Sequence, residues 1–185
     1  MRQVVDADRI RAFMRTLGRA ADAPAQVFMT GGATAVLVGW RASTIDVDIK
    51  IVPDQDAVLR AIPALKEQLE INVELAAPDD FIPVREGWQD RSPFIAQEGP
   101  LTFRHFDLIA QALAKIERGH SQDVQDVLAM IERHLVDVAA LRADFQAIRP
   151  RLYRYPAIDP QAFADAVDRI TGRQDPEGFP GRARR

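Results

Sequence analysis

The chain has 185 residues, of which 47% are hydrophobic and 28% charged, and its formal net charge is −3. This length predicts one domain with room for a helical extension, and the apolar content is sufficient for a core. The absence of cysteine excludes disulfides, thiolate zinc sites and cysteine nucleophiles. The sequence has neither a signal peptide nor an apolar run of membrane-spanning length, so we expect a cytoplasmic protein with no membrane partner.

Helices and strands are predicted to alternate through the first half of the chain. Apolar residues at helical spacing predict an amphipathic helix over residues 6–20. The strand QVFMT ends just before Gly31, and a short helix over residues 32–38 follows, with Gly39 as a left-handed stop. Period-two alternation predicts strands over residues 43–51 and again at INVEL, residues 71–75. This order is typical of a small α/β or α+β sheet domain.

A further helix is predicted between these two strands, and the second half of the chain is mostly helical. The helix over residues 54–69 has Asp54 as its expected N-cap and Pro63 as a kink or break. Residues 77–100 predict a long irregular connection, with short edge strands around Phe94 and over residues 101–105. Four helices are expected to follow: the first closes at Gly119, Ser121 and Asp137 cap the next two, and the last starts at Asp159 or Pro160.

We therefore divide the chain into three parts. Residues 1–105 form the sheet core, residues 106–172 form a helical region packed on it, and residues 173–185 form a flexible tail rich in glycine, proline and arginine.

Two aspartates stand one residue apart in the strand that ends at Ile51. Asp46 and Asp48 alternate with isoleucine and valine, so both carboxylates point to one face of the strand. Adjacent carboxylates repel each other, and divalent cations such as Mg²⁺ prefer oxygen ligands of this kind. Glu74, on the polar face of the next strand, is the candidate third carboxylate of a two-metal site, although Asp79 and Asp80 are rivals.

The glycine pair that precedes these aspartates predicts a phosphate site. Gly31 and Gly32 lie where a strand meets a helix N-terminus, and glycines there leave backbone N–H groups open to an anion. Thr34 can add a hydroxyl contact to the same phosphates.

The stretch TGGATAVLVGWRASTIDVDI, residues 30–49, resembles the DNA polymerase β-like nucleotidyltransferase superfamily. It looks most like the bacterial group that includes the AbiEii-type toxins of type IV toxin–antitoxin systems. Arg41 and Thr44 match the pattern of that group, as do both aspartates, whereas Ala33 and Thr34 stand in swapped order. The resemblance implies that Arg41 and Thr44 help to bind the nucleotide.

A second motif extends the resemblance into the helical half. The segment ALAKIERGHSQDVQDV supplies Lys115 and Arg118, which the resemblance implies to be nucleotide-binding, and Asp123 and Asp126, which it implies to organise the site. The usual third carboxylate of the group is aspartate, so Glu74 departs from the pattern.

The resemblance also implies a fold and an activity. The expected fold is α+β, a small mixed β-sheet flanked by helices. The expected reaction needs two Mg²⁺ ions and moves a nucleoside monophosphate from an NTP to a hydroxyl of RNA, such as a tRNA end, or of a protein. A toxin of this kind would have a cognate partner protein encoded nearby. A nucleotide- or RNA-binding module without turnover, or an antitoxin with the same fold, remains an alternative.

Overall fold

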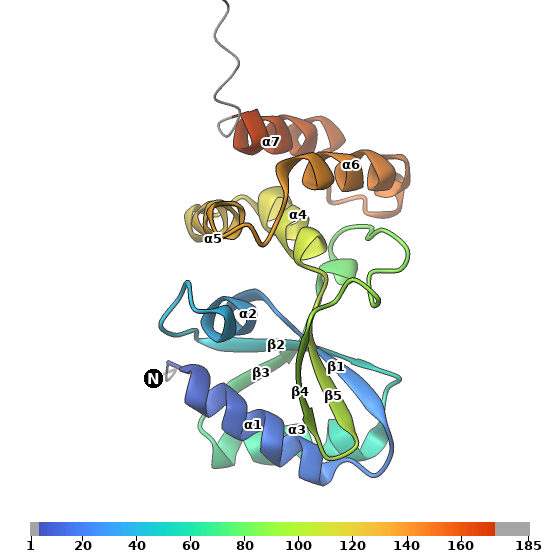
Figure 1. Ribbon diagram of the computed structural model, residues 1–185. Helices are drawn as coiled ribbons and strands as arrows, with labels where there is room; N and C mark the ends of the chain where they lie inside the picture. The colour runs from blue at the N-terminus through green and yellow to red at the C-terminus, as the bar shows by residue number, and fades with distance from the viewer. Residues whose placement is uncertain (1–3, 173–185) are drawn as a thin grey trace, which may run out of the picture.

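The computed structural model describes residues 4–172 and contains a five-stranded mixed sheet with helices on both sides (Figure 1). The strand order is β3-β2-β1-β5-β4, in which β1 is antiparallel to β2 and parallel to β5. β3 runs parallel to β2 at one edge, and β4 runs antiparallel to β5 at the other. The strands are β1 (Ala25–Thr30), β2 (Asp46–Val52), β3 (Asn72–Leu75), β4 (Phe94–Glu98) and β5 (Leu101–His105).

The α+β class with a mixed sheet and flanking helices is confirmed. Helices α1, α2 and α3 belong to the sheet half, and α4 to α7 form a separate layer above it in Figure 1. The bounds are α1 (Ala7–Ala20), α2 (Gly31–Val38), α3 (Asp56–Gln68), α4 (Leu108–Arg118), α5 (Ser121–Glu132), α6 (Val138–Ile148) and α7 (Pro160–Gly172), with 3₁₀ turns η1 (Pro78–Asp80) and η2 (Arg149–Arg154). The predicted tail, residues 173–185, lies outside the described residues.

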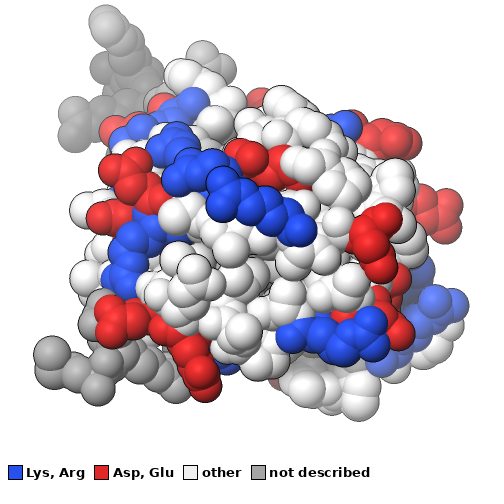
Figure 2. All heavy atoms as spheres, turned by 90° about the horizontal axis from the view of Figure 1, so that it is seen from below, with Lys and Arg blue, Asp and Glu red and all other residues white. Residues whose placement is uncertain are grey.

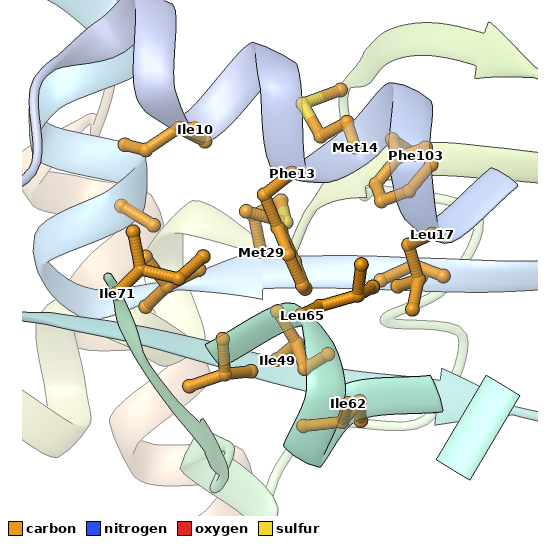
Figure 3. Close-up of a cluster of buried hydrophobic side chains, with 14 of the residues drawn as sticks. Ile10, Phe13, Met14, Leu17, Met29, Ile49, Ile62, Leu65, Ile71 and Phe103 are labelled. Carbon is orange, nitrogen blue, oxygen red and sulfur yellow. The ribbon is translucent and has the colours of Figure 1, made fainter. Parts of the chain in front are cut away.

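One face of the sheet carries the larger core of the sheet half (Figure 3). The apolar stripe of α1 packs on it because helical spacing places its large residues on one side. α3 contributes Ile62 and Leu65, and the strands contribute every second residue, since successive side chains point to opposite faces. The labelled side chains of this core are Ile10, Phe13, Met14, Leu17, Met29, Ile49, Ile62, Leu65, Ile71 and Phe103.

The helix ends follow the predicted signals in most places. Asp6 caps α1 by accepting a hydrogen bond from the Arg9 N–H at 2.9 Å, and Asp137 caps α6 in the same way. Gly39 and Gly119 both adopt positive φ, at 96° and 70°, and end α2 and α4. These two positions therefore favour glycine.

Several predicted details were wrong. α3 starts at Asp56 with Gln55 as N-cap instead of Asp54, and the Gln55 amide donates to the backbone carbonyls of residues 23 and 24. Of the kink or break predicted at Pro63, the break does not occur, since this proline lies inside α3. His120, and not Ser121, occupies the N-cap of α5. β5 is an inner strand between β1 and β4, so only β4 of that pair is an edge.

The view from below Figure 1 looks onto the α1 and α3 side (Figure 2). Basic and acidic side chains are interspersed there around an uncharged centre. The exposed residues of α1 include Arg11, Arg15 and Arg19. Within residues 4–172, no helix combines the length and apolar content needed to cross a membrane.

Candidate active site

The aspartates of β2 lie on the sheet face opposite the α1 and α3 core. Asp46 and Asp48 are partly buried, while the residues that alternate with them belong to that core. Asp48 is the register partner of Thr30 on β1 and of Glu74 on β3, and Asp46 is the partner of Asn72. Because directly opposed residues on neighbouring strands share a face, the sheet brings the three predicted carboxylates together.

Asn72 holds two of these carboxylates. Its side-chain amide donates to Asp46 Oδ1 at 2.7 Å and to Glu74 Oε1 at 3.0 Å. This amide was not singled out from the sequence, although its place on the polar face of the same strand as Glu74 was a signal for it. Over the described part of the chain, no group of three or more acidic or histidine side chains is already arranged to hold a metal ion.

The environment of Asp48 disfavours its ionised form. The pKa of this carboxyl is raised to about 6, chiefly by burial and then by the charges of Glu74 and Asp46, against the opposing effect of Arg118 and Lys115. A carboxylate with excess negative charge around it is suited to a cation.

A residue from the helical half accepts a hydrogen bond from the backbone of the glycine pair. The Gly31 N–H donates to Gln111 Oε1 of α4 at 3.0 Å, and the Gln111 amide donates to Phe106 O at 2.8 Å. Gly31 itself has φ +58°, and a Cβ there would lie 2.7 Å from Asp48 Oδ2. Gly31 is therefore needed for its conformation and for its close approach to Asp48, and its amide is not open to an anion in this structure.

Gly32 and Thr34 also differ from the expected phosphate cradle. A Cβ on Gly32 would lie 2.0 Å from Thr44 Oγ1, so this glycine makes room for a neighbouring side chain. Thr34 is completely buried, and its hydroxyl donates to Met29 O at 3.1 Å. Thr44 is buried as well and donates to Asp46 O at 3.1 Å. These three residues support the strands behind the site.

The second motif forms a network of ion pairs between the sheet half and the helical half. Lys115 Nζ lies 2.6 Å from Asp126 Oδ2 and 3.3 Å from Asp123 Oδ1, and Lys115 is only 5% exposed. Arg41, which follows α2, contacts Asp126 through Nε at 2.8 Å and Nη2 at 2.5 Å. Asp126 thus holds Arg41 and also contacts Lys115.

Arg118 pairs with Asp123 but keeps an open side. Its Nε and Nη2 lie 2.7 and 2.5 Å from the two Asp123 oxygens, while its side chain remains 58% exposed. The Asp123 hydrogen bond raises the pKa of the guanidinium, and the charge of Asp48 contributes in the same direction. Arg118 therefore faces the carboxylates of the sheet while α5 holds it in place.

A cavity of about 270 Å³ lies between the sheet and α4. Its size is close to the lower end of small-molecule sites, which have roughly 300–1,000 Å³. Five of the predicted site residues line this cavity. The other predicted site residues lie outside the lining: Asp46, Gly32, Thr34, Arg41, Thr44, Asp123 and Asp126. The lining residues are Thr30, Gly31, Asp48, Glu74, Ala76, Ala77, Pro78, Phe81, Gln111, Ala114, Lys115, Glu117 and Arg118.

The family match of this α+β protein places it in the nucleotidyltransferase class. Residues 8–162 match the family described as "Nucleotidyltransferase of unknown function (DUF6036)". This match covers most of the chain, and the protein belongs to that family. No curated protein and no solved structure matches the chain in the corresponding comparisons.

Proposed function

We propose that the protein is an Mg²⁺-dependent enzyme that transfers a nucleoside monophosphate from an NTP to a hydroxyl group. The observation that carries this proposal is the shared cavity of Asp48 and Glu74 from the sheet with Lys115 and Arg118 from α4. Carboxylates suit the metal that accompanies a triphosphate, and the cations suit its phosphate oxygens.

The charge around the cavity supports a divalent cation. Three cations and five carboxylates gather in the predicted site, which leaves two negative charges in excess. Hard carboxylate oxygens with such an excess fit Mg²⁺, which commonly takes one or two protein carboxylates and completes its shell with water and substrate phosphates. The eight groups are Arg41, Lys115 and Arg118 against Asp46, Asp48, Glu74, Asp123 and Asp126.

Asp46 and Asp48 would hold the metal, with Glu74 as the third ligand expected from the sequence. When bound, Mg²⁺ lowers the pKa of the attacking hydroxyl and neutralises charge on the leaving pyrophosphate. Asn72 orients Asp46 and Glu74 through its two hydrogen bonds. This amide therefore positions the carboxylates before substrate arrives.

The two cations of α4 have different parts in this proposal. Lys115 has two carboxylate partners, so its charge is largely balanced and it mainly holds α4 against α5. Arg118 has one partner and an exposed side chain, so it is the better phosphate ligand. The resemblance had implied that both would bind nucleotide.

In the proposed reaction, the acceptor oxygen forms a bond to the α-phosphorus of the NTP. The bond from that phosphorus to the α,β-bridging oxygen breaks, pyrophosphate leaves, and the hydroxyl proton is released to solvent. The acceptor we favour is RNA or a protein hydroxyl, as the resemblance of residues 30–49 to the AbiEii-type group implies. A toxin role with a partner protein encoded nearby is part of the same proposal.

The test is incubation of the purified protein with each labelled NTP, Mg²⁺ and either total tRNA or cell lysate. We expect label in one class of acceptor and equimolar pyrophosphate, both lost on chelation of the metal. Asp48→Asn is the matched variant, because it removes the charge and keeps the shape. Nucleotide binding without label transfer to any acceptor would instead support the non-catalytic binding module.

A further inference from the structure

Phe81 is a large aromatic residue that is exposed at the cavity. It follows η1 and is 58% exposed, and its side chain belongs to the cavity lining. The neighbouring Ile82 is completely buried. The chain therefore anchors one residue in the core and presents the adjacent phenyl ring at the cavity.

The segment that carries Phe81 is held in place from several sides. Lys50 Nζ lies 2.9 Å from Asp79 Oδ2, and the Tyr155 hydroxyl donates to Asp79 O at 2.9 Å. The Ala77 N–H donates to Asp80 Oδ2 at 2.8 Å, which closes the turn on itself. These contacts join β2, η1 and the segment after η2, so the position of Phe81 is fixed by the fold.

The lining of the cavity divides by chemistry. Its charged residues are two cations and three carboxylates: Lys115, Arg118, Asp48, Glu74 and Glu117; Ala114 of α4 is apolar. The segment after β3 adds only apolar surface, through Ala76, Ala77, Pro78 and Phe81. A ligand that fills such a site needs an anionic part and a flat or apolar part.

We propose that Phe81 is the stacking face for the nucleobase of the NTP, with the apolar residues around it completing the base subsite. The inference rests on the proposed function, since it assigns the other end of the same substrate. The charged part of the lining receives the triphosphate, and the phenyl ring offers its face to the base. Base–aromatic stacking accepts every base, so Phe81 supplies affinity and not base selection.

A second exposed phenylalanine provides a matched control. Phe94 on β4 is 60% exposed and lies outside the cavity lining. Isolated exposed apolar residues are common on protein surfaces and need no function. If Phe81 were such a residue, its replacement would have the same small effect as replacement of Phe94.

The experiment measures equilibrium binding of ATP, GTP, CTP, UTP and inorganic tripolyphosphate, each with Mg²⁺, by calorimetry. The wild type is compared with Phe81→Ala, Phe81→Trp and Phe94→Ala. We expect Phe81→Ala to weaken the affinity for NTP about 10- to 100-fold. The affinity for tripolyphosphate should stay within about twofold of that of the wild type. Phe81→Trp should keep NTP affinity, and Phe94→Ala should change neither ligand.

The outcomes separate this inference from the proposed function. If NTP and tripolyphosphate bind equally and Phe81→Ala changes neither, stacking on Phe81 is overturned and the proposed function stands. If Phe81→Ala weakens both ligands alike, the residue shapes the site without stacking, and the inference is again overturned. If the wild type binds neither ligand with Mg²⁺, the proposed function fails and takes the inference with it.

Discussion

On β2, Val47, Ile49 and Ile51 pack into the core beneath α1 and α3, whereas Asp46 and Asp48 lie on the face toward α4. One strand therefore contributes its apolar side chains to the core and its carboxylates to the candidate site. Burial of the apolar side stabilises the fold. The raised pKa of Asp48 shows that the carboxylate side costs stability at neutral pH. Replacements of adjacent residues on the two faces should thus change the free energy of unfolding in opposite directions.

The largest effect is expected for Asp48→Asn. Loss of this carboxylate should lower transfer activity about 1,000-fold or more, since metal-assisted charge stabilisation contributes several kcal/mol at about 1.4 kcal/mol per tenfold. The free energy of unfolding should rise by about 1–3 kcal/mol at pH 7.5 without metal. Labelled-NTP assays and urea titrations measure the two changes.

The sign of the stability change follows from the raised pKa. The folded-state pKa of about 6 exceeds the ordinary aspartate value of 3.8. Protonated Asp48 therefore stabilises the fold below about pH 4, and this stabilisation is lost as the pH rises through 6. The advantage of Asp48→Asn should shrink in the same window on acidification. A variant with near-normal transfer activity would contradict the assignment of Asp48 to the site.

Ile49→Ala tests the other face at the next position. Ile49 is completely buried in the α1 and α3 core. Truncation should lower the free energy of unfolding by about 2–5 kcal/mol. Transfer activity per folded molecule should stay near that of the wild type. A loss of activity without a loss of stability would show that the two faces are not separable in this way.

His105 should give the fold a dependence on acidic pH. Burial lowers the pKa of His105 to about 4 from 6.5, and its ring contacts the Thr34 hydroxyl at 3.1 Å. The unfolded chain then binds the proton first, so stability falls as the pH drops from about 6.5 to 4, by up to about 3 kcal/mol. Urea titrations at a series of pH values give the free energy of unfolding. Across this range it should depend more steeply on pH in the wild type than in His105→Asn. Parallel curves would contradict the buried neutral imidazole.

Gly32→Ala should act on the support of the site and not directly on the ligand. The new Cβ would meet Thr44 Oγ1 at 2.0 Å, so the side chain or strand must shift, at about 1–3 kcal/mol. The double variant Gly32→Ala, Thr44→Ala removes that hydroxyl and should recover part of the stability. Thermal unfolding of the wild type and these two variants measures the loss and the recovery of stability. Weakened NTP binding at unchanged stability would instead favour the predicted phosphate cradle.

The smallest effect is expected for Arg118→Lys. Lysine keeps the charge but cannot reproduce the two-pronged contact that Arg118 makes with Asp123. We expect transfer activity to fall about tenfold or less, with little change in stability because the side chain is largely exposed. Arg11→Lys on α1 is the control, since Arg11 is exposed and lies outside the cavity lining. Equal activity in both variants would remove Arg118 from the site.

The local features of this fold were predictable because neighbours in sequence decide them. Alternation along β2 placed Asp46 and Asp48 on one face, and positive φ at Gly39 and Gly119 followed from their places after apolar helices. The contacts that join the halves were not predictable. Gln111 reaches Gly31 across 80 positions, and only the assembled fold makes this pairing visible. For the predicted phosphate cradle, no local signal in the sequence indicates that the Gly31 amide donates to Gln111 in this structure.

Phe81 and Asn72 show the same limit within the site. Asn72 alternates with Val73 on β3, so its face was predictable but its bridging of Asp46 and Glu74 was not. Phe81 lies in a connection without periodicity, where neither burial nor direction can be inferred. The insertion of β5 between β1 and β4 likewise depends on contacts between distant segments.

Asp126 has a consequence for how the molecule unfolds. Its carboxylate accepts from Arg41 and Trp40 of the sheet half and from Lys115 of the helical half. Separation of the halves would take Arg41 and Trp40 away from this buried carboxylate and leave it with Lys115, which is unfavourable. The two halves should therefore melt cooperatively, in a single transition seen alike by tryptophan fluorescence and far-ultraviolet circular dichroism.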